Sequence, residues 1–252
     1  MKKKIAFIIF SIATLIPCTV TAGDFLDALQ MKARVGYSIG GTAPLGIPAT
    51  IRSLDSYRLT PSFMAGLDVT LPLHDKWGVL TGLHIESKAM DADVTTKAYR
   101  MELRKGSELI EGLFTGHIQQ KVKEWMFTLP VMATCQLGSN VQLKAGPYFS
   151  LLFSKDFSGI ASDGYLRQGD PTGPKIIMGD KEGEWATYDF SDDMRNFQFG
   201  LGAGVDWQVC KQLGVSADLN WGLTGIFKSS FKTVEQTLYP IYGTIGVYYR
   251  IK

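Results

Sequence analysis

The chain of 252 residues is poor in cysteine, histidine and net charge. It has three cysteines and three histidines, without Cys-x-x-Cys or His-x-x-x-His spacing, so the sequence contains no zinc-module pattern. The formal net charge is only +2, with both signs interspersed, which argues against a nucleic-acid binder. No apolar run approaches the roughly 20 residues that a membrane-spanning helix needs. Hydropathy alone would therefore class the mature chain as soluble.

The N-terminus has the pattern of a secretory signal. Three lysines at residues 2–4 precede an apolar run of about a dozen residues and a short stretch of small residues. The apolar run is too short for a transmembrane anchor. Cys18 raises the possibility of a lipoprotein, but Pro17 stands where lipoprotein signals have a small residue. We expect a cleaved signal peptide over residues 1–22 and one mature domain over residues 23–252.

The mature chain is rich in strict alternation of apolar and polar residues. In the last segment, residues 238–252 (LYPIYGTIGVYYRIK), one face consists of Tyr239, Ile241, Gly243, Ile245, Val247, Tyr249 and Ile251. Period two predicts a β-strand with one apolar side, about twice the usual 5–6 residues in length. Seven more segments repeat the pattern, at residues 31–42, 60–71, 77–88, 121–134, 141–153, 196–209 and 214–227.

Short and long connections alternate between these eight segments. Short turns follow the second, fourth and sixth segments, and the long connections are residues 43–57, 89–120, 154–195 and 228–237. This layout is typical of an outer-membrane barrel, with short periplasmic turns and long external loops. The strands that flank residues 105–107 are expected to extend past the membrane as a hairpin. Residues 154–195, rich in Gly, Asp and Pro, are expected to form an irregular loop.

The apolar faces could point toward lipid, or into the core of a soluble lipocalin-type barrel. They carry almost no charge and end in aromatic residues, which favours lipid. The polar faces also have fewer charges than a water-exposed surface. The expected aromatic belts are Trp77, Trp207 and Tyr249 near the short turns, and Phe63, Phe153, Phe197, Phe227 and Tyr239 near the long loops. The fold predicted is all-β, an eight-stranded antiparallel up-and-down transmembrane barrel of outer-membrane type. The lipocalin-like barrel is the alternative.

An eight-stranded barrel is only wide enough for side chains to fill its interior. The inward faces of the predicted strands carry charges of both signs, and buried charges must be paired. The expected lumen network consists of Arg34, Asp68, His84, Glu86, Lys88, Glu124, Lys144, Asp206, Asp218 and Arg250. The sequence therefore predicts a lumen plugged by salt bridges rather than an open diffusion channel.

Five stretches resemble successive motifs of the PorT-like outer-membrane β-barrel family. They are residues 124–130 (EWMFTLP), 144–153 (KAGPYFSLLF), 196–207 (NFQFGLGAGVDW), 219–227 (LNWGLTGIF) and 244–250 (TIGVYYR). The resemblance implies an integral outer-membrane barrel of a Gram-negative bacterium, without implying a particular activity. The founding member is associated with protein secretion across the outer membrane. The family ordinarily ends on an aromatic residue, whereas here Ile251 and Lys252 follow Tyr249.

Few residues suggest catalysis or cofactor binding. His84 and Glu86 share an inward face and His117 lies in the second long loop, so a hydrolase or acyltransferase in the barrel mouth is one alternative. No nucleophile motif accompanies them, and we expect no catalytic, cofactor or metal site. The glycines of residues 200–204 (GLGAG) are not followed by a helix, so they are expected to relieve crowding inside the barrel rather than bind a nucleotide.

Three functions stay open at this point. The first is a binding or structural barrel that acts through its extracellular loops, the second a secretion-accessory barrel, and the third a small-barrel enzyme. The partners expected are outer-membrane lipid and an extracellular or secretion-machinery protein, with no nucleic acid and no cofactor. Cys135 and Cys210 lie on non-adjacent predicted strands with opposite parity, so two free thiols are expected.

Overall fold

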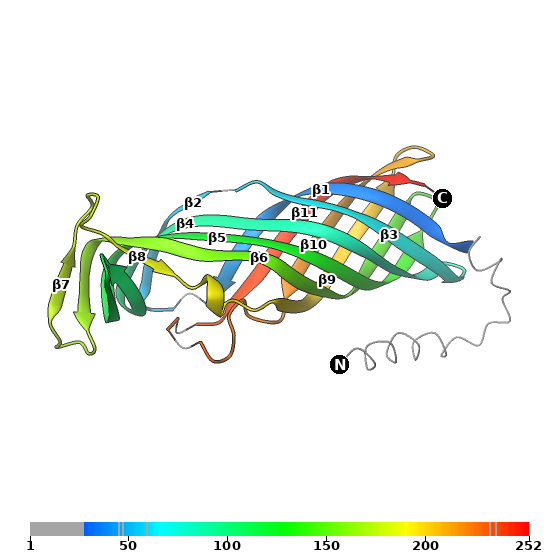
Figure 1. The fold of residues 1–252 in the computed structure, drawn as a ribbon. Coiled ribbons are helices and arrows are strands. Elements are labelled where there is room, and N and C mark those ends of the chain that lie inside the picture. The colour runs from blue at the N-terminus through cyan, green and yellow to red at the C-terminus, as the bar shows by residue number, and fades with distance from the viewer. Residues whose placement is uncertain are drawn as a thin grey trace.

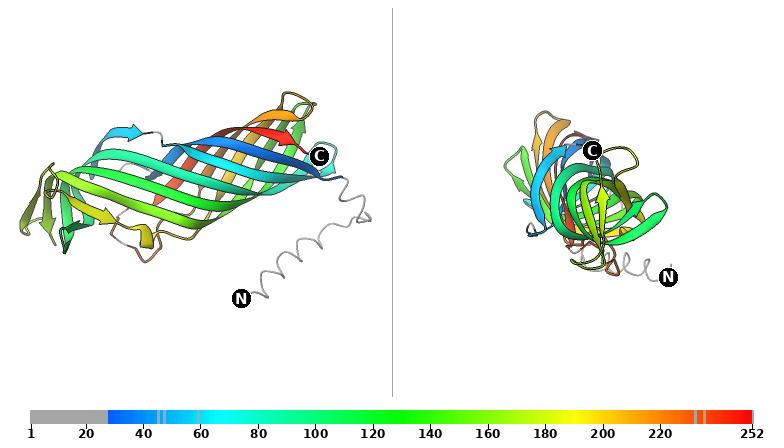
Figure 2. Two further views of the ribbon diagram at one scale, coloured as in Figure 1. Left: turned by 45° about the horizontal axis from the view of Figure 1, so that its top comes forward. Right: turned by 90° about the vertical axis from the view of Figure 1, so that its left-hand side faces the viewer.

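A computed structural model describes residues 28–251 of the chain, apart from residues 45, 47, 59, 232 and 235. The predicted signal peptide, residues 1–22, lies outside the described residues. Figure 1 shows a long barrel of tilted strands, and Figure 2 (right) looks along it. We call the end that carries the long connections the outer end and the opposite end the periplasmic end.

Eight strands form a closed antiparallel ring. In ring order they are β1 (Gln30–Pro44), β3 (Ser62–His74), β4 (Trp77–Lys105), β5 (Glu108–Leu137), β6 (Val141–Gln168), β9 (Phe197–Gln208), β10 (Leu213–Gly222) and β11 (Leu238–Arg250). The ring closes where β11 pairs with β1, for example Val35 opposite Val247. The predicted eight-stranded up-and-down barrel is confirmed.

Three neighbouring strands project far beyond the rest. β4, β5 and β6 have 29, 30 and 28 residues, whereas about 9–11 residues suffice to cross a membrane. β4 and β5 stay paired up to Lys105 opposite Glu108, which confirms the predicted hairpin. Figure 1 shows the projecting strands on the left, with the short strand β7 at their tip. These strands form an extension at the outer end.

The expected irregular loop over residues 154–195 is wrong in part. β6 continues to Gln168, and β7 (Lys175–Met178), β8 (Ala186–Asp189) and the 3-10 helix η1 (Ser191–Asp193) follow. Three apolar side chains of this segment, Phe157, Ala161 and Leu166, are fully or almost fully buried. A register shift in the β5–β6 ladder changes the parity between Ala161 and Leu166, so the strand shows no clean period of two in the sequence.

Two further differences concern the strand ends. The seventh strand, expected to reach residue 227, ends at Gly222. The first long connection contains an unexpected strand, β2 (Ile51–Arg58), which pairs antiparallel with β4 beyond the end of β3. Two register shifts interrupt the β2–β4 ladder, so β2 lacks the clean alternation that a sequence search detects.

The apolar faces of the barrel strands point outward and the polar faces inward. Val35, Leu67 and Val247 are about half exposed, whereas Lys32 and Asp68 are buried. A continuous apolar exterior fits lipid and not water, so the lipocalin alternative is wrong. Among the described residues, no helix combines the length and apolar character required to traverse a membrane.

The interior changes character along the barrel. Toward the periplasmic end it holds mainly charged and polar side chains, whereas the extension encloses an apolar cluster that we call the outer core. The outer core consists of Met90, Met101, Leu103, Ile110, Phe114, Ile118, Val122, Phe157, Ala161, Leu166, Met178, Ala186, Tyr188, Phe190, Met194, Ile226 and Leu238. The extension is therefore a folded body with its own packing rather than a set of loose loops.

Candidate functional site

Asp206 on β9 is the centre of the charged lumen. Its carboxylate accepts hydrogen bonds from Lys32 Nζ at 2.9 Å, Arg34 Nη2 at 2.9 Å and Lys144 Nζ at 2.8 Å. All four side chains are almost completely buried. Lys32 was absent from the predicted network, although it lies on the same inward face of β1 as Arg34. That shared parity is the signal that would have found it.

The network continues toward the outer end through alternating charges. Arg34 Nε lies 3.2 Å from Asp68, whose other oxygen lies 2.7 Å from His84 Nε2. His84 Nδ1 lies 3.7 Å from Glu86, and Glu86 lies 3.3 Å from Lys88 Nζ. Each buried charge in this chain faces an opposite charge, as burial in a low-dielectric interior requires.

Most of the ten predicted lumen residues meet in one network. Asp218 contacts Arg34 at 3.3 Å and Lys144 at 2.8 Å, which joins it to the Asp206 group. Glu124 is separate and accepts a hydrogen bond from Gln198 at 2.8 Å. Arg250 is also separate, and donates to Gln208 at 2.6 Å near the periplasmic end.

Inward glycines leave room for this network. A Cβ atom on Gly204 would lie 2.0 Å from Asp218 Oδ1 and 2.8 Å from Lys144 Cε. A Cβ atom on Gly200 would lie 2.6 Å from the ring of Tyr148. The side chains therefore approach the strand backbone so closely that only glycine fits, which agrees with the crowding expected for residues 200–204.

The lumen has almost no empty space. The cavity among Arg34, His84, Tyr148 and their neighbours measures about 20 Å³. That volume accommodates about one water molecule. The barrel interior is thus filled by paired side chains at the level of the membrane.

The aromatic residues expected in two belts lie mostly on the outward surface. Trp77, Trp207, Tyr249, Phe63, Phe153 and Phe197 are exposed, and Tyr239 is partly buried. Phe227 differs from the expectation. Because β10 ends at Gly222, Phe227 leaves the strand pattern and packs on the outer core, 4.8 Å from Phe157 and 4.7 Å from Phe231 between ring centroids.

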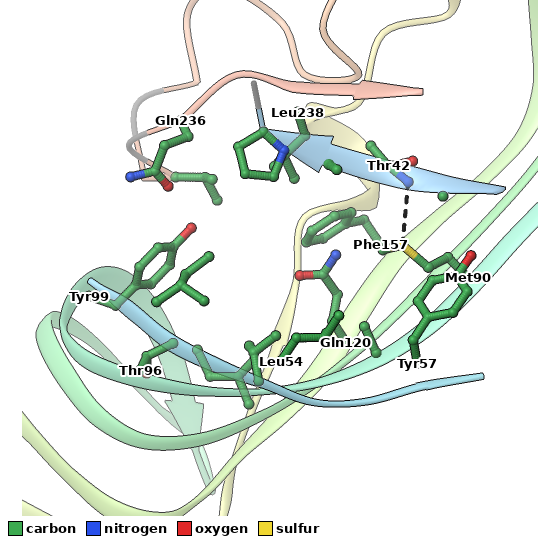
Figure 3. A pocket seen from close by; sticks show the side chains of 18 of the residues that line it. Thr42, Leu54, Tyr57, Met90, Thr96, Tyr99, Gln120, Phe157, Gln236 and Leu238 are labelled. Carbon is green, nitrogen blue, oxygen red and sulfur yellow. Dashed lines mark hydrogen bonds between the residues drawn. The ribbon is translucent and has the colours of Figure 1, made fainter. Parts of the chain in front are cut away.

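A larger cavity lies above the charged lumen, where the barrel joins the extension. It measures about 690 Å³, within the usual 300–1,000 Å³ of ligand pockets. Its inner wall is apolar and comes mainly from the outer core, with Met90, Met101, Ile118, Phe157 and Leu238. Figure 3 shows Phe157, Leu238 and Met90 facing this space, which we call the apolar pocket.

One side of the apolar pocket coincides with an interruption of the barrel wall. β1 pairs with β11 as far as Pro44, but its pairing with β3 ends where Ser38 faces Ser62. β2 pairs with β4 alone. Residues 39–44 of β1 and 51–58 of β2 therefore face each other without a ladder, and we call this gap the seam. In the described part of the chain one direct hydrogen bond crosses it, from the Tyr57 hydroxyl to the Gly40 carbonyl.

Two charged residues of β2, Asp55 and the pocket-lining Arg52, differ in their pairing. Asp55 accepts hydrogen bonds from Ser53 at 2.6 Å and Thr95 at 2.5 Å, and lies 3.4 Å from His117 Nδ1. The hydrogen bonds from Ser53 and Thr95 hold the pKa of Asp55 below its usual value. The Arg52 guanidinium, which also lines the pocket, has no ion pair within the described ranges.

The histidines and cysteines that the structure describes lie in separate surroundings. Both ring nitrogens of His84 face carboxylates, and His117 contacts Thr95 and Asp55 at the surface. Within the residues that the structure describes, no cluster of three or more His, Cys, Asp and Glu side chains could hold a metal ion. Cys135 and Cys210 are both free thiols.

A closed ring of eight strands, lipid-compatible outside and charged inside, defines an integral outer-membrane β-barrel. The chain belongs to the family described as outer membrane protein beta-barrel domain, whose model matches residues 24–228. It is accordingly a protein of the bacterial outer membrane. No curated protein matches it.

Several solved barrels resemble this chain at low identity. The attachment invasion locus protein Ail of Yersinia pestis, solved with the heparin analogue sucrose octasulfate, is 12% identical with a TM-score of 0.40, over 88% of this chain and 99% of its own. CarO2 of Acinetobacter baumannii is 10% identical with a TM-score of 0.42, over 88% and 99%. Neisserial surface protein A is 11% identical with a TM-score of 0.38, over 89% and 97%.

Proposed function

We propose that this protein is a ligand-binding barrel whose binding site is the apolar pocket between barrel and extension. The observation that carries this proposal is the contrast between two interior spaces. The membrane-level cavity measures about 20 Å³, whereas the pocket above it measures about 690 Å³ and is walled by apolar side chains. A large, mostly apolar cavity with a few polar groups is the usual form of a small-molecule site.

The charged lumen argues against a diffusion pore. A solute that crossed it would have to displace Arg34, Lys144 and their carboxylate partners, each of which would then be left buried without its partner. Separating such pairs costs about 3–5 kcal/mol each. The lumen below the pocket is therefore closed to solutes, and we assign the barrel the role of holding the pocket at the membrane.

The enzymatic alternative has less support. A barrel-mouth hydrolase would need a base free to activate a nucleophile, yet His84 lies between Asp68 and Glu86. A partner protein at the outer surface, a secretion-accessory role and membership of the PorT-like branch stay predictions. Comparison of the secreted proteins of wild-type and deletion strains tests the second of these roles.

A small neutral photolabel tests the binding function. The full-length protein in lipid nanodiscs would be irradiated with an iodophenyl diazirine, which labels apolar surfaces, and the labelled residues mapped by peptide mass spectrometry. We expect labelling of Met101 and Ile118, which face the pocket. Leu80 and Met126 are equally buried in the filled part of the barrel and serve as the internal control.

The comparison of the two pairs gives a clear outcome. Higher labelling of Met101 and Ile118 than of Leu80 and Met126 supports an accessible pocket. Equal labelling of all four residues would mean that the pocket admits no ligand, and the proposed function would be wrong. Outward residues such as Leu67 are labelled by the lipid-dissolved reagent in either case and report that the reaction worked.

A further inference from the structure

We propose that the apolar pocket takes the hydrocarbon chain of a single-chain amphiphile with an anionic head, which enters from the outer leaflet through the seam. This inference rests on the proposed function and adds the class of ligand and the route. Four features carry it: the height of the seam, its apolar edges, its lack of strand pairing and an unpaired arginine at the rim.

The seam begins at the level of the membrane surface. Directly below it, Tyr37 of β1 packs edge-to-face on Phe63 of β3, with ring centroids 5.8 Å apart. Both rings point outward, and aromatic side chains gather where the hydrocarbon meets the headgroups. An opening that starts two residues above such a pair faces the headgroup region of the outer leaflet, where amphiphiles are concentrated.

The edges of the seam suit a hydrocarbon chain. Ile39 of β1 and Leu54 of β2 line the pocket and are 43% and 59% exposed, so apolar surface continues from the exterior into the pocket. Inside, the chain would meet Met90, Ile118 and Phe157. Since the side chains named here are apolar, a hydrocarbon chain can follow them from lipid into the pocket.

The seam can open without breaking a β-ladder. β1 stays paired with β11 as far as Pro44, and β2 is paired with β4, but residues 39–44 and 51–58 share no ladder with each other. Two hydrogen bonds hold this part of β1, one from Tyr57 to the Gly40 carbonyl and one from the Thr42 N–H to Met90 Sδ at 3.3 Å (Figure 3). A hydrogen bond makes only a small net contribution to stability, so thermal motion suffices to open the seam.

The polar rim favours an anionic head. Arg52 lines the pocket beside the seam without a counter-ion in the described part of the chain, while the nearby carboxylate of Asp55 is engaged by Ser53 and Thr95. A guanidinium binds carboxylates and phosphates through paired hydrogen bonds. A fatty-acid-like molecule would therefore hold its chain in the pocket and its head at Arg52.

The test uses a palmitate analogue with a diazirine in mid-chain and the full-length protein in zwitterionic nanodiscs. We expect photolabelling of Met101, Ile118 and Phe157. Arg52→Gln should reduce this labelling two- to fivefold, as expected for one partly exposed ion pair. The matched variant Arg100→Gln, on an exposed arginine paired with Glu111 outside the pocket, should have no effect.

A second pair of variants tests whether the probe must enter the pocket to label it. Ala92→Trp places a large ring in the pocket and should abolish labelling there. Ala145→Trp makes the same change on the outward face and should leave labelling intact. Heat-modifiable gel migration reports whether each variant is folded. Because Arg52 is exposed, Arg52→Gln keeps the proposal testable even if Ala92→Trp does not fold.

The route is tested by closing the seam. In a protein with Cys135→Ser and Cys210→Ser, the pair Gly41→Cys and Tyr57→Cys would be joined by a reducible bismaleimide. A Cβ atom on Gly41 would lie 3.1 Å from the Tyr57 hydroxyl, so the two positions face each other across the seam. We expect the joined protein to lose palmitate labelling of the pocket and to regain it after reduction.

The outcomes separate this inference from the proposed function. Labelling of the pocket that survives the cross-link would overturn lateral entry. Head recognition would be overturned if the methyl ester of the probe labelled the pocket as well as the free acid does, or if Arg52→Gln were labelled as well as the wild-type protein. If the neutral diazirine labels the pocket and the palmitate probe does not, the pocket binds another class of ligand and this inference is wrong. If neither reagent labels it, both proposals fail.

Discussion

The hydroxyl of Tyr57 on β2 donates a hydrogen bond to the carbonyl of Gly40 on β1, across the stretch where these strands share no ladder. Removing the hydroxyl by Tyr57→Phe should loosen the seam while the ring stays in place. We expect faster amide hydrogen exchange over residues 39–44, with a rise of roughly two- to tenfold for one lost hydrogen bond. Mass spectrometry of peptic peptides measures it. Tyr165→Phe, on the distant strand β6, is the control. Equal exchange in both variants would show that the hydrogen bond of Tyr57 does not hold the seam closed.

Asp206 holds three cations in the lumen, and its replacement tests the charged network. Asp206→Asn keeps the shape of the side chain but leaves Lys32, Arg34 and Lys144 facing a neutral group. We expect a loss of about 3–5 kcal/mol in the free energy of unfolding, because Lys32 is left buried without a carboxylate while Arg34 and Lys144 keep Asp68 and Asp218. Urea unfolding followed by heat-modifiable gel migration measures this loss. The exposed Asp180→Asn should be near neutral, and an equally small effect at Asp206 would show that the network does not stabilise the barrel.

Phe157 joins the outer core to the wall of the apolar pocket. Its ring is almost completely buried and packs on Phe227, Tyr188 and Phe190. Phe157→Ala should cost about 3–5 kcal/mol of local stability. We expect the extension to become sensitive to trypsin while the membrane-level barrel stays folded. Phe153→Ala, four residues earlier on the lipid-facing side of the same strand, is the matched control and should leave the digestion pattern unchanged.

The attachment of β2 to β4 should weaken at low pH. The lowered pKa of Asp55 means that its ionised form is favoured by the folded contacts with Ser53 and Thr95. These contacts therefore contribute fully above the usual carboxyl pKa of about 3.9 and are lost as the pH falls through the lowered value. A spin label at Arg58→Cys, in the protein without Cys135 and Cys210, should gain mobility in that window. Asp55→Asn should remove the pH dependence, and a label that responds to acid equally in both proteins would contradict this role.

The barrel was predictable from the sequence because period two constrains every membrane-spanning strand. Lipid on one side and a narrow lumen on the other leave few choices at positions such as Val35 or Asp68. The same alternation predicted which charged residues point into the lumen. It did not predict which of them pair, because Asp206 and Lys32 are 174 residues apart and meet only through the closure of the ring.

The apolar pocket was not predictable in the same way. It depends on where β1 and β3 stop pairing and on the position of β2, whose register shifts hide it from a periodicity search. Phe227 shows the opposite error, since its parity suggested a lipid-facing residue although the strand had already ended at Gly222. Local alternation thus indicates which way a side chain points only as long as the strand continues.

Single-channel recording in planar lipid bilayers tests the central claim, a closed barrel that carries a binding pocket, most directly. With its lumen filled by the salt bridges of Asp206, Arg34 and Lys144, the purified protein in potassium chloride should show no stable conductance steps above the bilayer leak. Long-lived, ohmic openings by the wild-type protein, at a size that admits hydrated ions or sugars, would contradict the account.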